Sequence, residues 1–196
     1  MSKYGSYDEL ARGEMLGRDY RVWIKQASGS DVVVIAPHGG LIEVGTSEIA
    51  ELIAGGEYAL FSFEGLKAHG ANRDLHITSH RFDHPECLAL VSTAQLVLSV
   101  HGCRGDARIH IGGLDTQLGR GLARALSGAG FPVEASSERY PGRHPLNVCN
   151  RGARGMGAQL EVPYDLRGSQ ESRAAIAQAA RRAIAASRYI LRGGSS

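Results

Sequence analysis

Two histidines and a glutamate in this sequence are of the types, and in the positions, expected for a metal site. His38 and Glu43 follow the apolar run 32–35, and His101 follows a second apolar run at 96–100. Uninterrupted apolar runs predict strands buried on both faces, and open α/β sheets hold their ligands just beyond the carboxyl ends of such strands. A catalytic zinc needs three nitrogen or oxygen ligands and one open position. The three residues therefore predict a His/Glu/His zinc site.

Glu161 is predicted to be the general base of the same site. It stands inside the apolar stretch 158–163, where an unpaired buried carboxylate would cost several kcal/mol. We therefore expect it at an exposed edge or facing a polar site. Zinc lowers the pKa of its water to about 7, and a neighbouring carboxylate can then accept the proton of that water. This is the chemistry of a metal-dependent hydrolase.

Other metal sites and other enzyme classes have less support in the sequence. His76, His80 and His84 have the spacing of a metal-binding stripe on a helix, but Pro85 favours the first turn of a helix and places all three before it. We expect them to be loop histidines, of which one lines a pocket. The sequence contains no HExxH, Walker, GxGxxG or GxSxG motif, which argues against zincin proteases, P-loop enzymes, Rossmann dehydrogenases and serine esterases.

The elements that must position these residues alternate between strands and helices, which predicts one α/β domain over 1–196 with its core at about 20–191. The expected strands are 21–25, 32–36, 58–63, 96–100, 131–133 and 158–163. The expected helices are 7–16, one capped by Thr46 and ended at Gly55, 85–95, 115–125 and 169–191. Strand 21–25 is expected to pair with 32–36 across a turn at 27–30. Three stretches are expected to be irregular: 64–84, which holds a short strand at 73–78, then 104–113, and 136–157.

Composition and charge limit the possible partners and the cellular compartment. The 196 residues carry a net charge of only +2, which argues against a nucleic-acid partner. No apolar run approaches the roughly 18 residues of a membrane span, and the N-terminus lacks a signal-peptide pattern. The three cysteines have no CxxC spacing, which favours a reducing compartment. We expect a cytoplasmic protein, released on lysis if a phage encodes it, with a monomer as the default.

Several blocks of the sequence resemble the poly-γ-glutamate hydrolase family of phages and bacteria. The matching blocks are 37–48, 74–79 with 82–83, 100–102, 112–115, 150–152 and 159–161. Members of this family resemble zinc metallocarboxypeptidases, so the resemblance implies a three-layer α/β/α domain with a central mixed sheet. It also implies zinc on His38, Glu43 and His101 with Glu161 as the catalytic glutamate. The implied substrate is a polymer of glutamate joined through side-chain carboxylates and cut in its interior.

The arginines add an expectation about the substrate. Six of them stand in loops or at strand ends beside the candidate ligands: Arg73, Arg104, Arg108, Arg151, Arg154 and Arg167. Guanidinium groups match carboxylates in shape and charge, so a cleft lined by several would favour an acidic polymer or a γ-glutamyl amide. The residues assigned to substrate binding are Arg151, Asn150, Arg73, His76 and Arg104. Two alternatives stay open: a zinc amidase of peptidoglycan-type or other small amides, and a non-catalytic protein that retains the fold.

Overall fold

The computed structural model of the chain describes residues 2–68, 70–105 and 107–193. A seven-stranded mixed sheet forms its centre, in the strand order β1-β3-β2-β4-β7-β5-β6. The strands are β1 (Tyr20–Lys25), β2 (Val32–Gly40), β3 (Ala59–Gly65), β4 (Leu96–Cys103), β5 (Ile109–Gly113), β6 (Val133–Glu134) and β7 (Ala158–Pro163). The α-helices are α1 (Tyr7–Gly13), α2 (Thr46–Ala54), α3 (Pro85–Ser92), α4 (Thr116–Gly128) and α5 (Gln170–Leu191).

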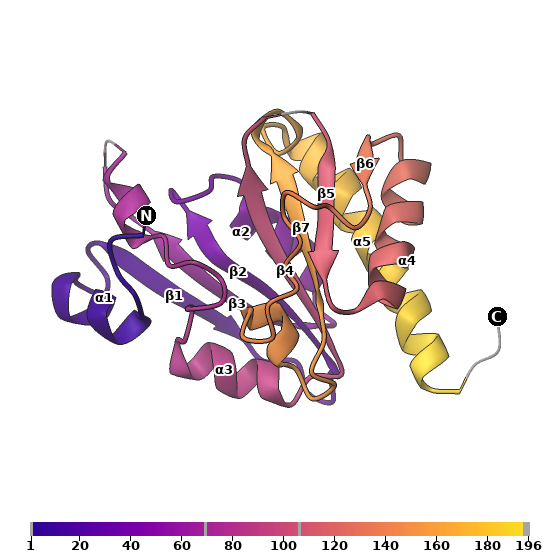
Figure 1. Cartoon of the computed structure of the whole chain (residues 1–196), viewed down its shortest axis with the longest axis horizontal. Helices are drawn as coiled ribbons and strands as arrows, with labels where there is room; N and C mark the ends of the chain where they lie inside the picture. The colour runs from indigo at the N-terminus through magenta and orange to yellow at the C-terminus, as the bar shows by residue number, and fades with distance from the viewer. Residues whose placement is uncertain (1, 69, 106, 194–196) are drawn as a thin grey trace.

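Helices cover both faces of the sheet and make three layers, which confirms the predicted α/β/α architecture. Figure 1 shows α2, α4 and α5 on one side of the sheet and α1 and α3 on the other. Each side has its own apolar core: Ile49, Leu122 and Ile184 belong to the first, and Leu10 and Val91 to the second. In the described ranges, no helix is long and apolar enough to cross a membrane.

The strands that carry the candidate site run in the same direction. β2 is parallel to β4, and β4 is parallel to β7, so all three end at one edge of the sheet. Successive residues of a strand point to opposite faces. Val97 packs in the core beneath α3 and Val100 in the core beneath α2, so His101 projects on the α3 side of the sheet. The sheet thus gathers the ends of 32–40, 96–103 and 158–163, as the sequence predicts.

Three predictions about the strands were wrong. β1 pairs antiparallel with β3, not with β2, because both edges of β2 are already occupied by the parallel strands β3 and β4. Residues 109–113, expected to be irregular, form β5 antiparallel to β7. The stretch expected to hold a strand at 73–78 forms instead the 3₁₀ helix η1 (Ala71–Leu75).

Candidate functional site

A tight turn at the end of β2 presents His38 and Glu43. The pairing of β2 with β3 shifts register between Ala36 and Gly39, so the strand bulges where the first histidine stands. Gly40 has φ 60°, and a Cβ there would lie 2.6 Å from the carbonyl oxygen of Gly65, which only glycine permits. The amide of Glu43 donates to the carbonyl of His38 at 3.0 Å, so the turn closes on itself.

Thr46 ties this turn to the helix behind it. It is the first residue of α2, whose N-cap is Gly45 and not Thr46 as the sequence suggested. Its hydroxyl instead donates to the carbonyl of Glu43 at 2.8 Å. The helix start therefore helps to fix the backbone of Glu43.

The rings of His38 and His101 face each other through their Nδ1 atoms. Their Nδ1 atoms are 3.1 Å apart, and both side chains are buried. His38 Nε2 lies 2.7 Å from the carbonyl oxygen of Ile77, which can only accept, so this nitrogen carries the proton and Nδ1 keeps its lone pair. His101 Nε2 is likewise bonded to the Ser99 hydroxyl at 2.8 Å. These outer contacts aim both Nδ1 atoms at one point.

Glu43 supplies an oxygen at the same point. Its Oε1 is 3.4 Å from His38 Nδ1, and its Oε2 is 3.9 Å from His101 Nδ1 and accepts the amide of Gly102 at 2.7 Å. Burial disfavours the charge, but His38, His76 and His101 outweigh it and hold the pKa of Glu43 well below its usual range. Burial beside His38 lowers the pKa of His101 to about 3. At neutral pH the site thus combines an ionised carboxylate with a neutral imidazole at His101.

His76 is a third histidine at this site. Its Nε2 is 3.5 Å from Glu43 Oε1, and His38, Glu43 and His76 form a group whose ligand atoms lie within 4.8 Å of one another. Its ring is stacked on His38 at 3.8 Å between centroids and 25° between planes. Because imidazole lone pairs lie in the ring plane, stacked rings do not converge on one ion. His101, tilted by 59° to His38, is the better third ligand.

The spacing of His38, Glu43 and His101 fits a tetrahedral zinc site. Zinc lies about 2.0–2.1 Å from nitrogen and oxygen ligands, so two ligands at a tetrahedral angle are about 3.3–3.4 Å apart. His38 Nδ1 lies 3.1 Å from His101 Nδ1 and 3.4 Å from Glu43 Oε1, close to this value, and the other carboxylate oxygen, Oε2, lies 3.9 Å from His101 Nδ1. The hydrogen bonds from Nε2 to Ile77 and Ser99 are the outer-shell contacts that orient metal-binding histidines. The donor set therefore fits zinc.

Glu161 lies beside His101 in the sheet. The two residues are paired in the parallel register of β4 and β7, which places their side chains on one face of neighbouring strands. Gln159 Nε2 donates to Glu161 Oε1 at 3.2 Å. Burial, followed by the charge of Glu43, raises the pKa of Glu161 well above its usual value, and Arg167 opposes this shift. A carboxylate of raised pKa next to a metal site suits a general base.

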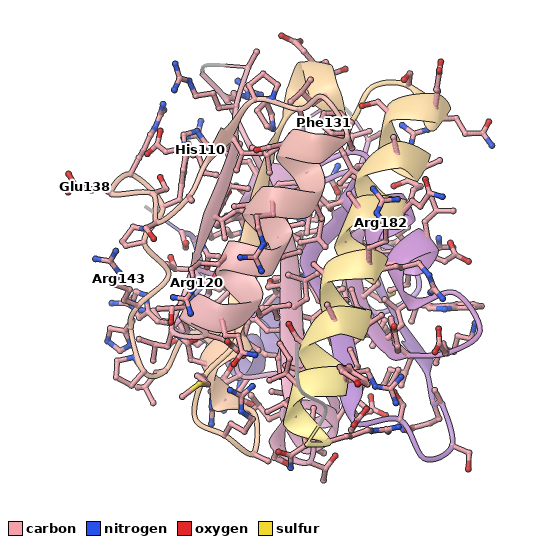
Figure 2. All side chains as sticks on the ribbon, turned by 90° about the vertical axis from the view of Figure 1, so that its right-hand side faces the viewer. His110, Arg120, Phe131, Glu138, Arg143 and Arg182 are labelled. Carbon is pink, nitrogen blue, oxygen red and sulfur yellow. The ribbon has the colours of Figure 1, made fainter. Side chains whose placement is uncertain are left out.

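His110, which sequence reasoning missed, extends this row of polar side chains. It is paired with Glu161 across the antiparallel strands β5 and β7, is buried, and lies 3.1 Å from the Ser137 hydroxyl through Nδ1. Figure 2 labels it on β5. The missed signal was a histidine between Ile109 and Ile111, the same polar interruption of an apolar strand that drew attention to Glu161.

A groove of about 500 Å³ opens beside the cluster. Its lining includes Glu43, His76, Arg73, Arg104, Tyr164 and Arg167. Arg73 and Arg104 are exposed, whereas Arg167 is buried. Three of the six arginines singled out in the sequence therefore meet at one groove, and a chain of carboxylates would find complementary charge there.

Asn150 and Arg151 lie elsewhere, in the 3₁₀ turn η2 (Val148–Arg151) packed against α3. Asn150 is buried and its side chain anchors two loops: Nδ2 donates to the carbonyls of Gly142 and His144, and Oδ1 accepts the amides of Leu114 and Gly157. With its amide group bonded to four backbone groups, Asn150 holds these segments together. Ala153, two residues after Arg151, donates to the carbonyl of Ala94, which precedes β4 and so lies at the opposite end of that strand from His101.

The sequence matches the family described as poly-gamma-glutamate hydrolase over residues 4–190. It is 39% identical over 169 residues to the UPF0714 protein YndL of Bacillus subtilis (strain 168). That alignment covers 85% of this chain and 66% of YndL, so the chain spans just under two thirds of that relative.

Two solved structures share the fold. A bacteriophage poly-gamma-glutamate hydrolase superposes with a TM-score of 0.89 and 29% identity, over 97% of this chain and 100% of that one. The apo, zinc-free form of YndL superposes with a TM-score of 0.85 and 34% identity, over 95% and 99% of the two chains. The family match spans most of the sequence, and the structural match agrees with it. The chain belongs to the poly-γ-glutamate hydrolase family.

Proposed function

We propose that the chain is a zinc-dependent hydrolase that cleaves the γ-glutamyl amide bonds of poly-γ-glutamate. The observation that carries the proposal is the convergence of His38 Nδ1, His101 Nδ1 and the Glu43 carboxylate within 3.1–3.9 Å, beside Glu161. The family match supports the substrate. The zinc-free form of YndL, a relative described as apo, supports the metal.

The residues divide the chemistry between them. His38, Glu43 and His101 would hold zinc, which supplies a Lewis acid that polarises the amide carbonyl and makes a water molecule more acidic. Glu161 accepts the proton of the attacking water and returns it to the nitrogen of the departing amine. Gln159, bonded to Glu161 Oε1, fixes the carboxylate for this transfer. The carbonyl of Ile77 keeps His38 in the tautomer that leaves Nδ1 free, and the Ser99 hydroxyl, which can donate or accept, holds the ring of His101 in place.

The groove selects the substrate by charge. A γ-linked glutamate chain carries one free α-carboxylate on every residue, and Arg73 and Arg104 line the path beside Glu43 and His76. Guanidinium groups bind carboxylates through paired hydrogen bonds. An uncharged amide would lack these contacts.

The test is product analysis. The zinc-loaded protein is incubated with poly-γ-glutamate and, separately, with α-linked polyglutamate, and chain lengths are followed by size-exclusion chromatography and mass spectrometry. We expect rapid shortening of the γ-linked polymer by cuts in its interior, and an intact α-linked polymer. A folded, zinc-loaded protein that leaves the γ-linked polymer unchanged would contradict the proposal.

A further inference from the structure

Arg167 is a buried arginine that forms no ion pair with a carboxylate of the described residues. It follows the 3₁₀ turn η3 (Tyr164–Leu166) after β7 and keeps only 5% of its surface exposed. Its Nε donates to the carbonyl of Val162 at 3.0 Å, and its Nη1 donates to the carbonyl of Val44. Within the described ranges, no carboxylate oxygen lies within ion-pair distance of the guanidinium.

The guanidinium reaches the three segments that carry the candidate site. Val44 follows Glu43 in the chain, and Val162 follows Glu161. Between them the group lies flat on Gly102, which follows His101: a Cβ there would be 2.5 Å from both Cζ and Nη2 of the arginine. These contacts place the guanidinium at the shared end of β4 and β7, against the residues that follow Glu43, His101 and Glu161 in the chain.

One amino group of Arg167 is left for a ligand. Among the described residues, Nη2 has no hydrogen-bond acceptor, and the side chain lines the groove together with Glu43. Nη2 is not among the buried atoms that lack a partner, so it opens toward the groove, where an anion can reach it. A carboxylate is the anion that matches a guanidinium in shape.

The chemistry of a γ-linked chain provides such a carboxylate at the right place. On the amine side of each amide bond, the nitrogen is attached to a carbon that itself bears a free carboxylate. In an α-linked chain the free carboxylate ends a longer side chain, two carbons further away. We propose that Arg167 binds the free α-carboxylate on the amine side of the scissile bond, and that it thereby selects γ-linked glutamate; this inference rests on the proposed function.

Two synthetic substrates test the assignment. Both contain one γ-glutamyl amide bond, and they differ only on the amine side, where one has a glutamate and the other has the same residue with its α-carboxylate converted to a primary amide. With the zinc-loaded wild-type protein, we expect kcat/KM to be about 10–100-fold lower for the second substrate. This is the effect expected from the loss of one charge-assisted hydrogen bond. In R167Q we expect this ratio to fall to about 3 or less, with the loss on the carboxylate substrate.

A purely structural role of Arg167 would give a different result with these two substrates. If Arg167 only holds the three segments together, R167Q loses rate on both substrates equally and keeps the wild-type ratio, which would overturn the inference. R167K, which retains the charge, serves the same measurement if R167Q does not fold. We expect an intermediate ratio because the single nitrogen of an ammonium lacks the planar, spread donors with which a guanidinium matches a carboxylate. R182Q is the matched control, since Arg182 is an exposed arginine on α5, labelled in Figure 2, and should leave both rates unchanged. A wild-type protein that cleaves neither substrate would contradict the proposed function itself.

Discussion

The Nδ1 atoms of His38 and His101 lie 3.1 Å apart, and the Nε2 atom of each ring is bonded elsewhere. The proton of His38 is committed to the carbonyl of Ile77. Without an ion, the two nitrogens are therefore satisfied only if His101 donates to His38, which takes the proton of His101 away from Ser99. Zinc between them satisfies both rings and the Glu43 carboxylate at once.

Replacing His101 by alanine should therefore abolish stoichiometric zinc binding. Elemental analysis of protein purified without chelator should give about one zinc per wild-type chain and almost none in H101A. H80A is the matched control because His80 is an exposed histidine of the neighbouring loop, and it should retain zinc. Full zinc in H101A together with its loss in H76A would assign the third ligand to His76.

The outer contact of His101 should be measurable on its own. S99A removes the hydroxyl 2.8 Å from Nε2 and leaves the ligands in place. Loss of such a partner typically weakens metal affinity about 10–100-fold. Competition with a fluorescent zinc chelator measures this change, and an unaltered affinity would mean that Ser99 does not orient the ring.

The variant E161Q should keep the metal and lose turnover. The amide is nearly isosteric with the carboxylate but cannot accept a proton, and loss of a general base typically costs about 10²–10⁴ in kcat. Zinc content and kcat are measured on the same preparation. Simultaneous loss of zinc would instead make Glu161 a ligand.

The same variant should be more stable than the wild type at alkaline pH when zinc is removed. The pKa of Glu161 is raised by folding, so the folded state binds more protons than the unfolded state as pH rises above the ordinary glutamate value. Stability due to this group is present at pH about 4 and is lost as pH rises through the folded pKa. Thermal unfolding in chelator should give equal Tm values at low pH and a higher Tm for E161Q at pH 8. A lower Tm for E161Q at pH 8 would contradict the assigned direction.

Charge at the groove should govern affinity for the polymer. R73A and R104A each remove an exposed guanidinium from the lining, so KM for poly-γ-glutamate should rise while kcat changes little. Added salt should raise the wild-type KM because it screens the same charges. R151A, the first choice from sequence, should have the smaller effect, since Arg151 lies in η2 against α3. A larger effect of R151A would move the polymer path to that side.

Much of the framework was predictable because local signals and long-range packing agree there. Apolar runs predicted β2, β4 and β7. Because these strands are parallel, they bring His38, His101 and Glu161, which stand at or near their carboxyl ends, to the same edge of the sheet. Capping residues such as Asp115 located helix starts, and the structure shows its carboxylate accepting the amide of Leu118.

The remainder depends on contacts between distant segments. The β1–β3 pairing was missed because a short connection between two strands suggests a hairpin, while the competition for the edges of β2 is visible only once the sheet is assembled. The strand β5 is short and ends in two glycines, so its pairing with β7, which brings His110 beside Glu161, left little local pattern. The separation of Arg167 from Arg151 likewise arises from the tertiary fold.

Titration of zinc into the metal-free protein, with polymer cleavage as the readout, decides whether the chain needs zinc for hydrolysis. Protein is stripped with chelator and dialysed, zinc is added in fractions of an equivalent, and the initial rate of poly-γ-glutamate shortening is recorded at each step. We expect no cleavage without metal, a rise that levels off at about one zinc per chain, and no activation of H101A by the same additions. Full activity of the metal-free protein, or equal activation of H101A, would contradict a zinc-dependent reaction at His38, Glu43 and His101.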